Sequence, residues 1–157
     1  MPAFRNERKV RHAPAAMFDL VADVERYPSF VPLCEALTVR QRINGDEGLE
    51  TLIADMSIGY KSIRETFTTR VTLDRPRLRI FVEYVDGPFR FLENRWVFRP
   101  AGEPDACIVD FFISYEFKSR TLGMLMGAVF DKAFKKFSDA FAARADTVYG
   151  DAGLAGA

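Results

Sequence analysis

The C-terminal stretch TLGMLMGAVFDKAFKKFSDAFAARADTVY, residues 121–149, is the clearest indication of the fold. Its apolar side chains recur every three or four positions, which predicts one amphipathic helix roughly 40 Å long. The lysines of the stretch fall on the opposite face, toward water. We expect the apolar stripe to pack against another layer of the fold, and it consists of Leu122, Met126, Val129, Phe130, Ala133, Phe134, Phe137, Phe141 and Val148.

The chain before this helix changes to the two-residue period of β-strands. Turn sequences such as NGDEG (44–48) and DGP (86–88) separate the expected strands, and short turns between consecutive strands predict antiparallel pairing. An edge strand at 3–10 and a helix at 14–25 come first. The six strands that follow are expected near 35–43, 49–58, 61–73, 78–86, 89–99 and 106–117.

These elements predict an α+β fold in which a curved antiparallel sheet of six to seven strands grips the long helix. A hydrophobic space between the two layers is a common ligand site. We expect one domain over residues 1–150 and a disordered tail at 151–157.

Alternation along each strand assigns its two faces. On the strand 61–73, Phe67 and Val71 point inward, and so does the carboxylate of Glu65, which needs a partner there. Asn94 and Tyr115 are the other inward polar side chains. These three groups either orient a ligand head group or form a satisfied buried network, and the pattern leaves both open.

The composition restricts the functions to consider. Lys plus Arg equals Asp plus Glu, 22 each, which argues against a general nucleic-acid binder. Fifteen phenylalanines indicate a large aromatic interior, packed or hollow. Cys34 and Cys107 are expected as small buried hydrophobes in a reducing compartment. With no signal peptide or spanning segment visible, we expect a cytoplasmic protein whose membrane contact, if any, is peripheral.

Catalytic motifs are missing from the sequence. His12 is the sole histidine and is expected at the surface or as a helix cap. No nucleophile elbow, phosphate loop or cysteine cluster is present, so we expect neither an enzyme nor a cofactor or metal. Gly123 and Gly127 in the long helix allow two readings: close packing against the sheet, or looseness at the entrance of a pocket.

A stiff apolar segment, YPSFVPLC (27–34), follows the first helix, and we call it the proline corner. Pro28 and Pro32 prevent a continuing helix. Large apolar residues stand where a polar loop would be ordinary. The corner is expected to form a rigid apolar rim at one mouth of the cavity, the alternative being that it only closes the core.

Together, YPSFVPLC, DGPFRFLENRWVF (86–98), DFFISYEFKS (110–119) and VFDKAF (129–134) resemble the coenzyme Q-binding members of the START-like, or polyketide cyclase/dehydrase, superfamily. The resemblance spans roughly residues 3–149. It implies the helix-grip fold with a hydrophobic tunnel, ubiquinone as ligand, and a role in respiratory electron transport or quinone biosynthesis. Many relatives carry glycine where this chain has Asn94, which would narrow or polarise the tunnel. RatA-type proteins, described as ribosome-associated, share the resemblance.

The leading prediction is a non-enzymatic carrier or chaperone of a polyprenyl quinone. The alternatives are a polyketide aromatase/cyclase-type enzyme and a ribosome-associated protein that uses the basic edge Arg5, Arg8, Lys9 and Arg11. The expected ligand-binding residues are Phe30, Val31, Leu33, Met56, Ile58, Phe67, Leu92, Asn94, Trp96, Phe111, Met126, Phe130 and Phe134.

Overall fold

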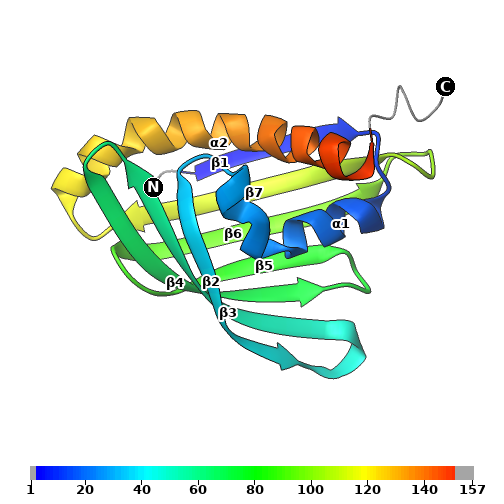
Figure 1. Cartoon of the computed structure of the whole chain (residues 1–157), viewed down its shortest axis with the longest axis horizontal. Coiled ribbons are helices and arrows are strands. Elements are labelled where there is room, and N and C mark those ends of the chain that lie inside the picture. The colour runs from blue at the N-terminus through cyan, green and yellow to red at the C-terminus, as the bar shows by residue number, and fades with distance from the viewer. Residues whose placement is uncertain (1–2, 151–157) are drawn as a thin grey trace.

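The computed structural model describes residues 3–150, so the tail expected at 151–157 lies outside the described residues. Seven strands form one antiparallel sheet in the order β1-β7-β6-β5-β4-β3-β2 (Figure 1). The predicted strands are confirmed to within a few residues. The elements are β1 (Ala3–Val10), α1 (Pro14–Ala22), a 3-10 helix (Val24–Ser29), β2 (Cys34–Asn44), a second 3-10 turn (Asp46–Gly48), β3 (Leu49–Tyr60), β4 (Ile63–Asp74), β5 (Arg79–Asp86), β6 (Phe89–Pro100), β7 (Cys107–Phe117) and α2 (Arg120–Tyr149).

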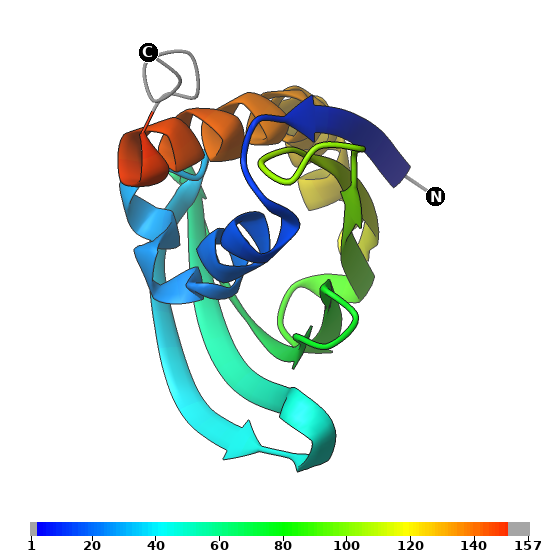
Figure 2. The same ribbon diagram turned by 90° about the vertical axis from the view of Figure 1, so that its right-hand side faces the viewer.

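The sheet curls into a trough, and α2 lies across its open side (Figure 2). The first strand, β1, pairs with the last strand, β7. The two edges of the sheet are therefore β1 and β2. α1 lies inside the curve, below α2. This arrangement is the expected α+β helix-grip fold.

Helix α2 forms as its apolar period requires. Ser119 caps its start by accepting a hydrogen bond from the Leu122 amide at 3.1 Å. Ala145 is the last fully buried side chain, and Val148, one turn later, is 48% exposed. The prediction that Val148 belongs to the buried stripe is therefore wrong. In the last turn of α2, Tyr149 contacts the rest of the fold instead, because its hydroxyl donates a hydrogen bond to the Ala16 carbonyl at 2.9 Å.

The first helix is shorter than predicted. α1 ends at Ala22, and a 3-10 helix that contains Pro28 follows it. The prediction for His12 is also wrong, since its ring is only 7% exposed and its Nε2 lies 2.7 Å from Oδ1 of Asp146. Ala13, not His12, occupies the N-cap of α1. His12 thus joins the start of α1 to the last turns of α2.

Candidate functional site: an apolar cavity under the long helix

A cavity of about 120 Å³ lies between α2, the concave face of the sheet and the proline corner. Its walls come from β2 to β7, α2, the 3-10 helix and the corner itself. Nearly every lining side chain is apolar, and the cavity is partly enclosed by them. Among its lining residues no Asp, Glu, Lys, Arg or His occurs.

Most of the residues that were predicted to bind a ligand face this cavity. The two that do not are Phe30 and Met126. Phe30 belongs to the proline corner, but its ring packs 5.1 Å from that of Phe141 and does not line the cavity. Met126 is fully buried in the core. The residues that line the cavity as expected are Val31, Leu33, Met56, Ile58, Phe67, Leu92, Asn94, Trp96, Phe111, Phe130 and Phe134.

Two phenylalanines of α2 line the cavity although they were not among the expected ligand-binding residues. They are Phe137 and Phe141, which follow Phe130 and Phe134 along the same face of the helix. The reason is that the cavity extends along α2 as far as the proline corner, whose Tyr27 ring lies 5.4 Å from Phe141. Four phenylalanines of one helix face therefore contribute to one wall.

Aromatic rings hold one another in place around the cavity. Trp96 meets Phe111 and Phe141 edge-on, with centroids 4.7 and 4.9 Å away. Phe130 and Phe134 meet at 5.5 Å in the same manner. Such tilted and edge-to-face pairs are favourable because of the ring quadrupoles. The wall is therefore largely preformed, and it suits a flat, apolar ligand.

Most polar groups at the wall already have partners. Tyr27 donates a hydrogen bond to the Val21 carbonyl at 2.5 Å, and burial raises the pKa of its hydroxyl. Asn94 donates from Nδ2 to the Phe112 carbonyl at 2.9 Å and accepts at Oδ1 from Trp96 Nε1 at 3.0 Å. Asn94 thus orients Trp96. Burial raises the pKa of the Cys34 thiol to about 11, so the thiol is protonated at neutral pH.

Sequence reasoning missed the polar lining residue of β4, Thr69. It is 6% exposed and stands on the inward face of β4, between Phe67 and Val71. The alternation that placed those two neighbours inward was the signal that could have found it. Of the polar candidates that were predicted, Glu65 and Tyr115 do not line the cavity; Glu65 is half-buried, and the Tyr115 ring packs 5.3 Å from that of Phe130.

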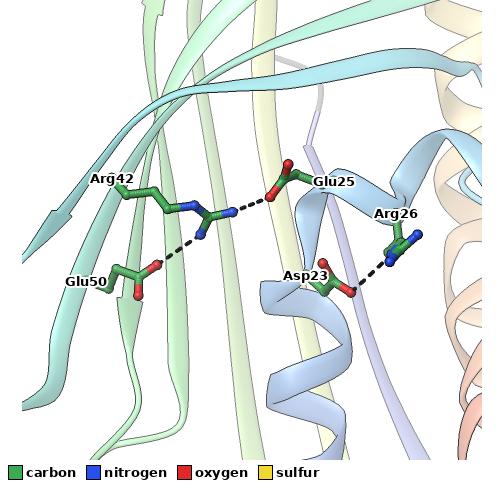
Figure 3. A network of polar contacts seen from close by, with 5 residues as sticks. All are labelled: Asp23, Glu25, Arg26, Arg42 and Glu50. Carbon is green, nitrogen blue, oxygen red and sulfur yellow. Dashed lines mark hydrogen bonds and ion pairs between the residues drawn. The ribbon is translucent and has the colours of Figure 1, made fainter.

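Ion pairs tie the approach to the proline corner to the sheet. Figure 3 shows Arg42 of β2 between Glu25, in the 3-10 helix, and Glu50 of β3. Asp23, at the N-cap of this 3-10 helix, forms a further pair with Arg26 inside it, at 3.8 Å. Exposed pairs of this kind contribute little stability each, about 0–1 kcal/mol. The two Arg42 pairs connect the segment before the proline corner to β2 and β3.

Leu33 carries backbone strain at the cavity wall. Its φ is 69°, in the left-handed region that L-residues other than Asn and Asp seldom adopt, and its carbonyl accepts a hydrogen bond from the Gly59 amide at 3.0 Å. The strain costs about 1–2 kcal/mol. The corner is therefore held in a shape that turns the Leu33 side chain into the cavity.

Residues 10–142 match the model of the family described as polyketide cyclase / dehydrase and lipid transport. The chain belongs to this family. A START superfamily protein from Mycobacterium smegmatis shares the fold of this family member, with a TM-score of 0.77 over 93% of this chain and 98% of that one, at 18% identity.

Two relatives of this family member carry informative names. The chain is 35% identical to the ribosome association toxin RatA of Vibrio cholerae over 135 residues, which cover 86% of this chain and 89% of that protein. It is 33% identical to the mitochondrial coenzyme Q-binding protein COQ10 of Drosophila melanogaster over 141 residues, which cover 88% of this chain and 56% of that protein. The description of the family thus includes lipid transport, and one of these two relatives is named for binding coenzyme Q.

Residues 3–150 contain no helix that is long and apolar enough to cross a membrane. Nor do three or more His, Cys, Asp or Glu side chains come together there as they would around a metal ion.

Proposed function

We propose that the protein binds and shields a ring-bearing lipid, with a polyprenyl quinone such as ubiquinone as the ligand. The observation that carries this proposal is the cavity of about 120 Å³ with its apolar, aromatic wall. The similarity to a coenzyme Q-binding protein supports it. In this proposal the protein serves quinone biosynthesis or respiratory electron transport by carrying the ligand to or from a membrane that it touches peripherally.

The cavity volume sets how much of such a ligand is enclosed. An engineered cavity of about 150 Å³ holds benzene, so 120 Å³ is close to the space of one unsubstituted ring. A substituted quinone ring therefore requires α2 and the sheet to separate slightly, and the polyprenyl tail must leave the cavity. Burying about 300 Å² of ligand would contribute about 7.5 kcal/mol. Since 1 μM affinity corresponds to about 8 kcal/mol, we expect micromolar binding at best.

The wall favours binding over catalysis. A polyketide cyclase needs a group that exchanges protons near neutral pH. The titratable groups at the wall are Tyr27 and Cys34, and burial raises the pKa of both. Neither therefore ionises near pH 7, which is why we place the function in a carrier and not in a cyclase.

A second candidate function is association with the ribosome. The observation that favours it is the RatA similarity, which covers most of both chains, whereas the COQ10 similarity covers 56% of that protein. The basic edge that we predicted for this role is less basic than expected. Arg8 pairs with Asp139, Lys9 lies 3.1 Å from Glu103, and Arg5 stacks on the Phe112 ring at 5.2 Å. The comparisons favour this candidate, and the geometry favours the lipid carrier.

One pair of experiments separates the two functions. Trp96 is the sole tryptophan and lines the cavity, so a quinone bound there should quench its fluorescence. We expect saturable quenching by a short-chain ubiquinone in the micromolar range, and none with Ala54→Phe, which fills the cavity with a ring. Ribosome co-sedimentation that persists in Ala54→Phe, combined with no quenching in the wild type, would favour the second function.

A further inference from the structure

The Thr69 hydroxyl is the polar group of the cavity that remains free to bind. No hydrogen-bond partner for it exists among residues 3–150. Every side-chain nitrogen or oxygen of these residues that is inaccessible to solvent has a hydrogen-bond partner. The Thr69 hydroxyl has none, so it must be accessible, and the space that it lines is the cavity. The other polar lining groups bond within the protein: Tyr27 and Asn94 as described above, and the Cys34 thiol by donating to the Ala36 carbonyl at 3.8 Å.

The strand places this residue by its regular alternation. Thr69 pairs with Ala54 of β3 in an unbroken register, and it lies on the inward face of β4 between Phe67 and Val71, which also line the cavity. On its other side Thr69 pairs with Tyr84 of β5. Ala54 leaves space next to the hydroxyl and itself lines the cavity. A valine has nearly the same shape as threonine, so packing alone does not explain a hydroxyl at this position.

We propose that Thr69 is the head-group anchor of this cavity and donates a hydrogen bond from Oγ1 to a ring carbonyl oxygen of the ligand. This inference rests on the proposed lipid-binding function. A hydroxyl is both donor and acceptor, so the same atom accepts a hydrogen bond from the ring hydroxyl of a quinol. No charged side chain lines the cavity, so the anchor holds both the oxidised and the reduced ring and is indifferent to pH near neutrality.

The chemistry of the anchor also defines the ligand class. The wall is mostly apolar, and Thr69 is its one polar side chain without a partner among residues 3–150, since Tyr27, Cys34 and Asn94 bond within the protein. It therefore selects a neutral, flat ring with an oxygen substituent that points at β4, and it disfavours carboxylates and phosphates, which would be desolvated without a cation. Free fatty acids and phospholipid head groups are thus poor occupants of the inner cavity.

The test compares two probes on three variants. The probes are a short-chain ubiquinone and an alkylbenzene with the same alkyl chain, which has no oxygen. Thr69→Val removes the hydroxyl and keeps the shape, Thr69→Ser keeps the hydroxyl, and Thr72→Val makes the same change outside the cavity. We expect Thr69→Val to weaken quinone binding about tenfold and to leave alkylbenzene binding unchanged, while Thr69→Ser and Thr72→Val stay within about threefold of the wild type.

Three results would overturn the proposal. Quinone binding that Thr69→Val leaves intact, or an equal loss for both probes, would show that the hydroxyl contacts no ligand oxygen. A lower Tm for Thr69→Val would show that the hydroxyl has a structural partner, since loss of a free buried hydroxyl should leave the Tm equal or higher. Wild-type protein that binds neither probe would instead overturn the proposed function itself, and the anchor with it.

Discussion

Replacing Gly127 by alanine should stabilise the protein. A glycine inside a helix costs about 1 kcal/mol relative to alanine. A Cβ built at Gly127 would have no atom within 4 Å, so nothing in the structure offsets the gain. A Cβ at Gly123 would meet Phe117 Cβ at 3.8 Å, which is an ordinary contact. We therefore expect about +1 kcal/mol for Gly127→Ala and about +2 kcal/mol for the double variant.

Urea melts measure this gain directly, and a thermal melt should show a rise in Tm of about 2–4 °C for Gly127→Ala. The matched control is Gly87→Ala, which must destabilise, because its φ is +142° and its Cβ would lie 2.6 Å from Phe67 Cβ. Loss of stability in Gly127→Ala would show that α2 is closely packed at this position and that a Cβ there has no free space. If looseness at the start of α2 admits the ligand, stopped-flow quenching of Trp96 should also show slower quinone association in the stabilised variant.

Three further predictions concern the core, the thiols and the corner. Phe134→Ala should cost less than about 3 kcal/mol in urea melts, because Phe134 borders a cavity, whereas Phe18→Ala in the solid core should cost about 3–5 kcal/mol; equal losses would contradict the hollow wall. Burial raises the pKa of Cys34 and Cys107 from 9.0 to about 11, so the unfolded chain loses these thiol protons at lower pH than the folded protein does. The free energy of unfolding should therefore fall as the pH rises from about 9 to 11. Cys107→Ala should reduce that fall, and an unchanged pH profile would contradict the raised pKa. Pro32→Ala should lower the free energy of unfolding by about 0.4–1 kcal/mol, because the unfolded chain gains conformational freedom. It should also weaken quinone quenching of Trp96 by more than that loss of stability implies, and unchanged affinity would show that the corner is not part of the binding site.

The fold could be predicted because its signals are local. Strand alternation and helical spacing give the face of each residue, and the turn sequences give the order of the strands. The inward placement of Phe67 and Val71 was right for this reason. The same alternation assigns Thr69 inward, and it was missed only because a threonine does not stand out in an apolar row.

Depth along an element could not be predicted from these signals. Periodicity places Met126 and Phe130 on one face of α2, yet only Phe130 reaches the cavity. The start and end of the cavity depend on how far the sheet curls away from α2, which is set by long-range packing. His12 was misplaced for the same reason, since its partner Asp146 is distant in the sequence and adjacent only in the fold.

The most direct test of the central claim is organic extraction of the purified protein followed by mass spectrometry, with Ala54→Phe as the matched control. We expect a neutral, ring-bearing lipid of the quinone class in the extract of the wild-type protein, and its loss from Ala54→Phe, whose new ring occupies the cavity. Only unrelated phospholipid or no lipid in the wild-type extract, or the same quinone in both extracts, would contradict it.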